Sequence, residues 1–266
     1  MINKNELILD KVRSLTTHDL STGKMLFRLT SLEEPSLSCT AESEEVTDAI
    51  GSVITTLYRA KRATFSATNS LISLDLAAAQ YGTQKHIAND EDKILDYTYE
   101  ILAVTGATDT DAGKVTLAHT PKDDIKYIYT LVDGDIATAY EAGSTSSETN
   151  FVVGNNGEIT VPKGVANGTK IYVEYTYETA NAVAVTNKAS EFPEACSLII
   201  YAYFKDKCNE NVVYSGKVIC PKAKLNPEQV ELALTSTGKH SFEFTMMKDY
   251  CADEGEDELF TIIVAQ

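Results

Sequence analysis

The sequence lacks the features that mark membrane proteins, secreted proteins and zinc proteins. No apolar run among its 266 residues approaches the ~20 residues that cross a bilayer, and its start is not followed by the apolar stretch of a secretory signal. Its five cysteines lie 12 or more residues apart and form no CxxC pair. We therefore expect a soluble protein made in a cytoplasm, with no membrane segment and with free thiols packed as small apolar residues.

Groups that would support catalysis or bind a cofactor are also missing. Asp109–Gly113 starts like a calcium loop, but Lys114 and Thr120 stand where that loop needs glycine and glutamate. Two fragments that resemble phosphate loops, 21–24 and 236–239, lack the earlier glycine and are interpreted as hairpin turns. The four histidines lie far apart: His18, His86, His119 and His240. We predict no catalytic residues, no metal and no cofactor, and therefore no enzyme.

Basic residues are scarce, with 23 against 39 acidic residues and a formal net charge of −16. Such a chain repels nucleic acid, because tight binding needs lysine and arginine to neutralise phosphates. The acidity serves either solubility or a surface to which DNA must not adhere. The acidic run 253–258 is interpreted as a solvated loop before a last strand, with a share in an acidic channel as the alternative.

Apolar residues alternate with polar ones through most of the chain, which is the two-residue period of strands. Fourteen tyrosines and many Thr and Val residues suit half-buried pleated surfaces. The fold class predicted is therefore mainly β. The alternating apolar sets include Met25, Phe27 and Leu29; Leu37, Cys39 and Ala41; Ile171, Val173, Tyr175 and Tyr177; and Phe242, Phe244 and Met246.

One helix interrupts the strands, predicted over 69–82. Asn69 or Ser70 can cap its first turn, and Gly82 stands where a left-handed C-terminal cap favours glycine. Leu71, Leu74 and Ala78 would share its buried face.

Residues 101–180 differ from the rest of the chain in having short predicted strands separated by turn signals at regular intervals. Short strands are predicted at 114–117, 127–132, 150–153, 158–161 and 170–177, separated by turn signals such as Asp133-Gly134-Asp135. This spacing is typical of a small antiparallel sandwich. No Pro/Gly linker flanks the segment, which favours an insertion entered and left through strands. We predict a discontinuous domain, 1–100 and 181–266, with an inserted β domain at 101–180.

Two stretches of the flanking region resemble the tail tube proteins of tailed bacteriophages. The first is DAIGSVITTLYRAKRATFSAT, residues 48–68, an acidic strand followed by a glycine and a β segment rich in Thr and basic residues before the helix. The second runs from 222 to 244, a strand pair with a polar turn and an aromatic alternating strand. The resemblance covers about 1–100 and 181–266; the central segment, here taken as immunoglobulin-like, departs from it.

The resemblance implies a small β barrel or sandwich with one packed helix, whose subunits form hexameric rings that stack into a tube for the ejected genome. The partners implied are the chain itself and other tail proteins: the tape measure, and possibly a sheath, terminator or baseplate. Duplex DNA would pass through without specific binding, and the location would be the virion tail. The alternatives are a head decoration or connector protein, a bacterial surface or pilus-like protein with immunoglobulin repeats, and an enzyme.

Four carboxylates beside the predicted β pair are the candidates for lining the tube: Glu42, Glu44, Glu45 and Asp48. A negative wall would let DNA slide rather than adhere. The alternative is that these side chains only solvate an outer strand edge, where they would also discourage unwanted strand pairing.

Overall fold

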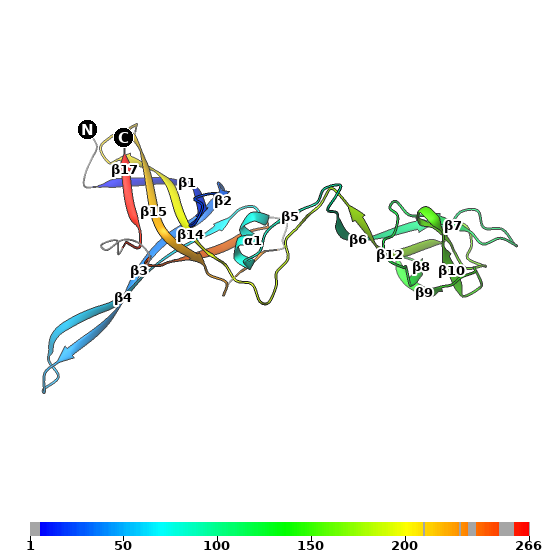
Figure 1. Cartoon of the computed structure of the whole chain (residues 1–266), viewed down its shortest axis with the longest axis horizontal. Coiled ribbons are helices and arrows are strands. Elements are labelled where there is room, and N and C mark those ends of the chain that lie inside the picture. Colours follow the sequence, from blue (N-terminus) through cyan, green and yellow to red (C-terminus); the bar gives the residue numbers. More distant parts are fainter. Residues whose placement is uncertain (1–5, 210, 229, 234–237, 250–257, 266) are drawn as a thin grey trace. The chain divides into compact units, whose positions relative to one another are not determined.

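The computed structural model describes residues 6–209, 211–228, 230–233, 238–249 and 258–265. These residues hold seventeen β-strands, one α-helix and one short 3-10 helix, so the mainly β fold class is confirmed (Figure 1). They divide into two compact units, one from residues up to 85 together with those from 185 onward, and the other from 86 to 184. No helix among the described residues is long and apolar enough to span a membrane.

The first unit is built on one antiparallel, nearly closed barrel-like sheet, as the sequence predicted. Seven of its eight strands follow one another side by side, and the eighth, β17 (Thr261–Ala265), pairs with β15 (Val213–Leu225) outside that order. The seven neighbouring strands, in spatial order, are β2 (Met25–Leu29), β1 (Leu7–Asp19), β14 (Ala195–Asp206), β15 (Val213–Leu225), β16 (His240–Met246), β4 (Val53–Asn69) and β3 (Leu32–Thr47).

Alternating residues of these strands fill one core. Phe242, Phe244 and Met246 are buried as their spacing predicted, and Phe65 of β4 packs beside Phe242 with ring centroids 6.4 Å apart. The set from β2 is split, because Phe27 and Leu29 are buried whereas Met25 is exposed. Cys196 and Cys220 join this core, and burial raises the pKa of the Cys196 thiol to about 12 and of the Cys220 thiol to about 11.

The helix α1 (Leu74–Tyr81) is shorter than the predicted 69–82. β4 continues through Asn69, so the capping residue is Ser73, whose hydroxyl accepts from the Leu76 N–H at 3.3 Å. The predicted C-cap is confirmed, since Gly82 adopts the left-handed conformation with φ of 69°.

The predicted buried face of the helix was mostly wrong. Leu71 and Leu74 are exposed, and of the three predicted residues only Ala78 is buried. Leu71 lies before the helix begins, and Leu76 and Gln80, four residues apart on one side of the helix, are buried instead.

A buried polar pair fixes the helix to the sheet. His240 of β16 has no exposed surface, and its Nε2 lies 2.5 Å from Oε1 of Gln80. The Gln80 amide donates to the Ser241 carbonyl at 3.0 Å, and the Ser73 N–H points at Nδ1 of His240 at 3.5 Å. The neutral imidazole protonated at Nε2 fits these partners, and burial lowers the pKa of His240 to about 4.

The second unit holds a seven-stranded sheet and a two-stranded one. β13 (Val183–Ala184) pairs with β5 (His86–Ile87). The seven strands, in spatial order, are β6 (Ile94–Ala103), β12 (Lys170–Thr179), β8 (Tyr127–Val132), β9 (Asp135–Ala142), β10 (Asn150–Val153), β11 (Glu158–Thr160) and β7 (Lys114–Thr116). The 3-10 helix spans Asn155–Gly157.

This unit has its own core, which includes Ile128, Phe151 and Ile171 with no exposed surface. Its strand pairs are antiparallel apart from β9 with β10, which run parallel. The turn between β8 and β9 forms as predicted, because Asp133 and Gly134 both take a positive φ, as a two-residue hairpin turn of the primed kind requires. The predicted insert, 101–180, lies within this unit.

Candidate functional site

The most unusual feature of the first unit is a long hairpin made by β3 and β4. β16 pairs with β4 only from Ala63 to Asn69, so residues 53–62 of β4 pair with β3 alone. In Figure 1 these two strands run on beyond the rest of their sheet. All the residues from 40 to 62 are exposed except Thr56, which is half-buried. We call residues 40–62 the hairpin arm.

Large apolar side chains gather near the tip of the hairpin arm. Ile50 is 88% exposed, Ile54 66% and Tyr58 74%, and Val46, Val53 and Leu57 are exposed beside them. An isolated two-stranded ribbon is at best marginally stable in water, and large apolar side chains gathered in solvent typically mark a binding site. Ile54 and Tyr58 lie on one face of the ribbon and Leu57 on the other. The hairpin arm is therefore a surface that needs a partner.

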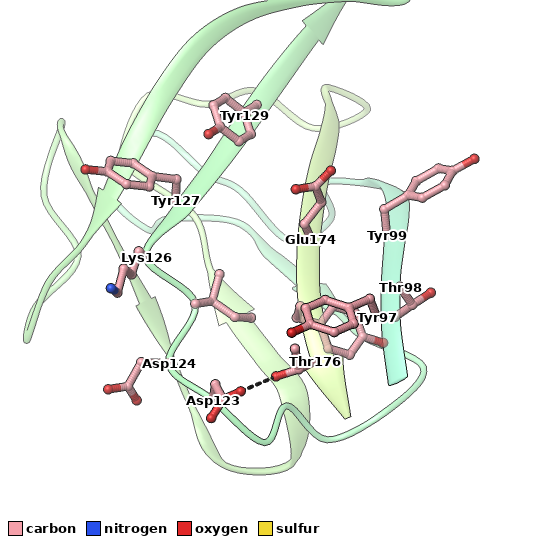
Figure 2. Close-up of a pocket in the computed structure, with 12 residues that line it drawn as sticks. Tyr97, Thr98, Tyr99, Asp123, Asp124, Lys126, Tyr127, Tyr129, Glu174 and Thr176 are labelled. Atoms are coloured by element: carbon pink, nitrogen blue, oxygen red, sulfur yellow. Dashed lines mark hydrogen bonds between the residues drawn. The ribbon is translucent and has the colours of Figure 1, made fainter. Parts of the chain in front are cut away.

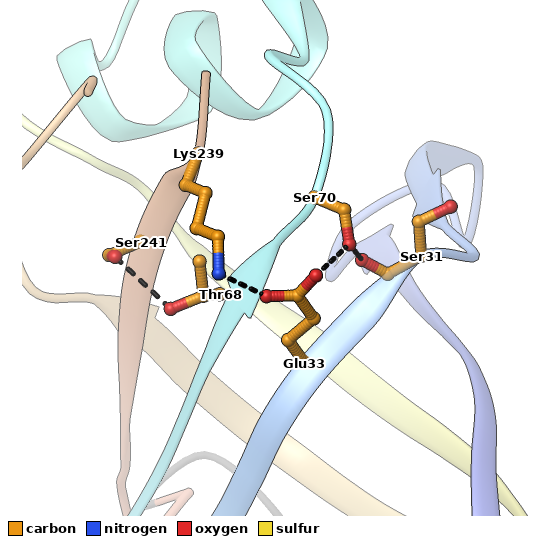
Figure 3. A network of polar contacts seen from close by, with 6 residues as sticks. All are labelled: Ser31, Glu33, Thr68, Ser70, Lys239 and Ser241. Atoms are coloured by element: carbon orange, nitrogen blue, oxygen red, sulfur yellow. Dashed lines mark hydrogen bonds and ion pairs between the residues drawn. The ribbon is translucent and has the colours of Figure 1, made fainter. Parts of the chain in front are cut away.

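Polar contacts tie β3 and β4 to the sheet at the end of the strand pair opposite the arm (Figure 3). The Glu33 carboxylate of β3 accepts from Lys239 Nζ at 2.6 Å and from the Ser70 hydroxyl at 2.9 Å. The hydroxyls of Thr68 and Ser241 lie 3.2 Å apart and join β4 to β16. The bond from Lys239 holds the pKa of Glu33 below its usual range. These contacts anchor the end of the two strands that lies within the sheet, and the arm extends from their other end.

All four carboxylates predicted to line a lumen lie on the hairpin arm, but they do not share one face. Glu42 and Glu44 stand opposite Arg59 and Leu57, two residues apart and therefore on the same face of the ribbon. Glu45 stands opposite Thr56 and points to the other face. The structure thus places all four carboxylates in one hairpin, but their side chains point to different faces of it.

Two of these carboxylates have basic partners on the paired strand. Glu44 lies 3.2 Å from Arg59, and Glu42 lies 3.7 Å from Arg62. These pairs are exposed, so each contributes little to stability. They change the electrostatic potential around the arm instead, because the arginines next to Glu42 and Glu44 offset part of the negative charge there. Glu45 has no ion-pair partner among the residues that the structure describes.

Asp48 has a structural role at the tip. One of its carboxylate oxygens accepts from the N–H groups of Ile50 at 3.0 Å and Ser52 at 2.8 Å. Gly51, with φ of 88°, completes the turn. Of the acidic run 253–258, which the sequence also offered for a channel, residues 253–257 lie outside the described residues.

Sequence reasoning placed Leu37, Cys39 and Ala41 at alternating positions of one strand, and they lie in β3, but their face is not buried. Leu37 is half-buried, and Cys39 and Ala41 are exposed where β3 leaves the core for the arm. It also missed the apolar tip, for which the only signal was the set of apolar residues between 46 and 58 in a segment already rich in charge.

No group of three or more ligand residues that could hold a metal ion exists in the described part of the chain. Three of the four histidines have separate partners: His86 bonds to Asp92 at 2.8 Å, His119 stacks on Tyr177, and His240 is the buried partner of Gln80. Asp111 accepts from the Thr108 hydroxyl at 3.1 Å in a turn rather than a calcium loop.

The barrel-like sheet, the α-helix and the exposed apolar hairpin together define a mainly β protein with large apolar side chains outside its core. The chain matches the model of the YomU/Tube protein family over residues 7–257. It therefore belongs to that family, and its resemblance to phage tail tube proteins is confirmed. A virion component with a structural role follows from this membership. None of the curated proteins matches the chain.

Proposed function

We propose that this protein self-assembles, through the hairpin arm, into stacked hexameric rings that form the phage tail tube through which DNA is ejected. The observation that carries the proposal is the apolar tip of the arm, where Ile50 is 88% exposed, Ile54 66% and Tyr58 74%. Covering such side chains against a neighbouring subunit gains about 25 cal/mol per Å² of apolar surface. Family membership supports the same role.

The partners proposed are further copies of the chain and the other proteins of a tail. Duplex DNA passes without specific binding, because the formal net charge of −16 opposes adhesion of phosphates. The immunoglobulin-like segment 101–180 is proposed to lie on the outside of the tube, since a domain of this size would obstruct a lumen.

Self-assembly is tested by sedimentation velocity over a concentration series with no added cofactor. We expect species much larger than the 29.0 kDa chain to grow with concentration. A single 29.0 kDa boundary at every concentration would refute the proposal.

The lumen proposal is narrowed by the geometry of the arm. Glu45 is the candidate to test, because Glu42 and Glu44 have arginine partners and Asp48 holds the turn. Glu45 shares its face of the ribbon with Ile54 and Tyr58, so the proposal requires that a neighbouring copy covers these two side chains and leaves Glu45 at the lumen. We expect phage carrying Glu45→Lys to assemble and to eject DNA several-fold more slowly. Added salt should relieve the defect, since the screening length falls below roughly 10 Å above 0.1 M.

The control for this prediction is Glu141→Lys on β9 of the second unit, an exposed site with the same change of charge. It should leave the ejection rate unchanged. Normal ejection from assembled Glu45→Lys particles would assign Glu45 to an outer strand edge and remove it from the lumen, while leaving self-assembly in place.

A further inference from the structure

The second unit presents a tyrosine-rich face that its fold does not require. Eight of the fourteen tyrosines lie between 86 and 184. Five of them come from neighbouring strands and point to the side away from the core: Tyr97 and Tyr99 of β6, Tyr172 of β12, and Tyr127 and Tyr129 of β8. We call these five residues the tyrosine face.

Strand β6 exposes its aromatic side chains and turns its acidic side chains towards the core, which is the reverse of an ordinary half-buried strand. Tyr97 is 78% exposed and Tyr99 62%, whereas the alternate residues Asp96 and Glu100 face inward. The inward carboxylates are satisfied: Asp96 accepts from the Tyr177 hydroxyl at 2.9 Å, and Glu100 accepts from the Ala118 N–H at 2.9 Å. Polar contacts therefore hold this strand with its aromatic side towards solvent.

Three rings of this face, those of Tyr99, Tyr172 and Tyr129, form a row across three strands. Tyr99 and Tyr172 stack with centroids 5.5 Å apart and planes at 27°. Tyr129 lies 6.3 Å from Tyr172 at 57°. The register supports this row, because Tyr172 is paired with Tyr129 on one side and Glu174 is paired with Tyr99 on the other.

Polar groups stand among the rings, in a pocket of about 540 Å³ (Figure 2). Glu174 lies on β12 between Tyr129 and Tyr99, and Thr176 donates to Asp123 at 2.7 Å. Asp124 and Lys126 complete the polar lining from the segment before β8.

This combination fits a sugar better than a protein. The C–H bonds on one side of a pyranose ring stack against the negative face of an aromatic ring. The hydroxyls of the sugar form hydrogen bonds with carboxylates and lysine. The centre of a protein interface is usually depleted of charge, whereas Glu174 lies among the rings here. Three carboxylates against one lysine repel an acidic sugar, so charge selects a neutral one.

We propose that the tyrosine face and its pocket form a binding site for a neutral saccharide. The site lies within the second unit and does not depend on self-assembly.

The test is isothermal titration calorimetry of the full chain with maltotriose, chitotriose and mannotriose, and with trigalacturonate as the acidic probe. Concentrations up to about 10 mM reveal even a millimolar Kd. We expect saturable binding of at least one neutral trisaccharide and none of trigalacturonate. These probes are monovalent, so the degree of assembly does not inflate their affinity.

Variants then locate the site. Tyr99→Ala should weaken binding roughly tenfold by removing one stacking ring, and Tyr99→Phe should keep most of the affinity. The matched control is Phe192→Ala, which removes an aromatic ring that is 64% exposed in the first unit, against 62% for Tyr99, and should bind as the parent does. Circular dichroism checks that each variant is folded.

Absence of binding by all three neutral probes, or equal binding by Tyr99→Ala and the parent, would overturn the proposal. So would tighter binding of trigalacturonate than of the neutral probes. A shift in self-association by Tyr99→Ala without any response to saccharide would assign this face to contacts between copies instead.

Discussion

A chain without the hairpin arm is expected to stay monomeric at concentrations where the parent assembles. The variant joins Thr40 to Arg62, which are paired across the ribbon, by an Asn-Gly turn in place of residues 41–61. None of the removed residues belongs to the core of the first unit, so the free energy of unfolding should change by less than about 1 kcal/mol. Sedimentation velocity and urea unfolding measure the two quantities.

Single substitutions refine this prediction without shortening the chain. Ile54→Ser should raise the concentration needed for assembly at least tenfold, since burying an isoleucine contributes about 1.5–3 kcal/mol. Ile136→Ser is the matched control, because Ile136 is 61% exposed on β9 against 66% for Ile54. Assembly of the shortened chain at the parent's concentrations would exclude the arm as the contact.

The second large effect is expected on stability below pH 7, from His240. In the folded chain its pKa is about 4, and in the unfolded chain it returns to the model-peptide value of 6.5. Between these values the unfolded chain binds the extra proton, so stability is complete above pH 6.5 and falls as the pH is lowered towards 4. The loss should reach on the order of 3 kcal/mol.

The comparison needed is with His240→Gln, whose amide can still donate to Gln80 but takes up no proton. Groups such as Asp19, whose pKa the bonds from Ser21 and Thr22 lower to about 2, titrate alike in both proteins and cancel. Urea unfolding at pH 7 and pH 4, below the concentration of assembly, gives the difference. Equal losses in the two proteins would show that His240 does not cause this pH dependence.

Local patterns predicted the elements that depend on local chemistry. The strands 127–132 and 150–153 form at their predicted bounds, and the Asp133-Gly134 turn and the Gly82 cap form because each needs backbone conformations that few residues adopt. β9 was missed, because alanine and threonine dominate Asp135–Ala142 and leave little contrast between its faces.

The parts that sequence could not give depend on contacts distant in the chain. The alternation in β6 indicates two faces but does not say which one is buried. Asp96 and Glu100 face inward because tyrosine hydroxyls and a backbone amide from other segments donate hydrogen bonds to them. The start of the helix moved to Ser73, since β4 keeps pairing with β16 through Asn69. The four acidic candidates share one hairpin, but only the register divides them between its faces.

Cryo-electron microscopy of the concentrated, unmodified protein tests the central proposal most directly. We expect hollow tubes or stacked rings of one repeating subunit, with sixfold symmetry and with Ile50, Ile54 and Tyr58 of each arm covered by a neighbouring copy. Fields of single particles the size of one chain would contradict the account, as would tubes in which the hairpin arm stands free in solvent.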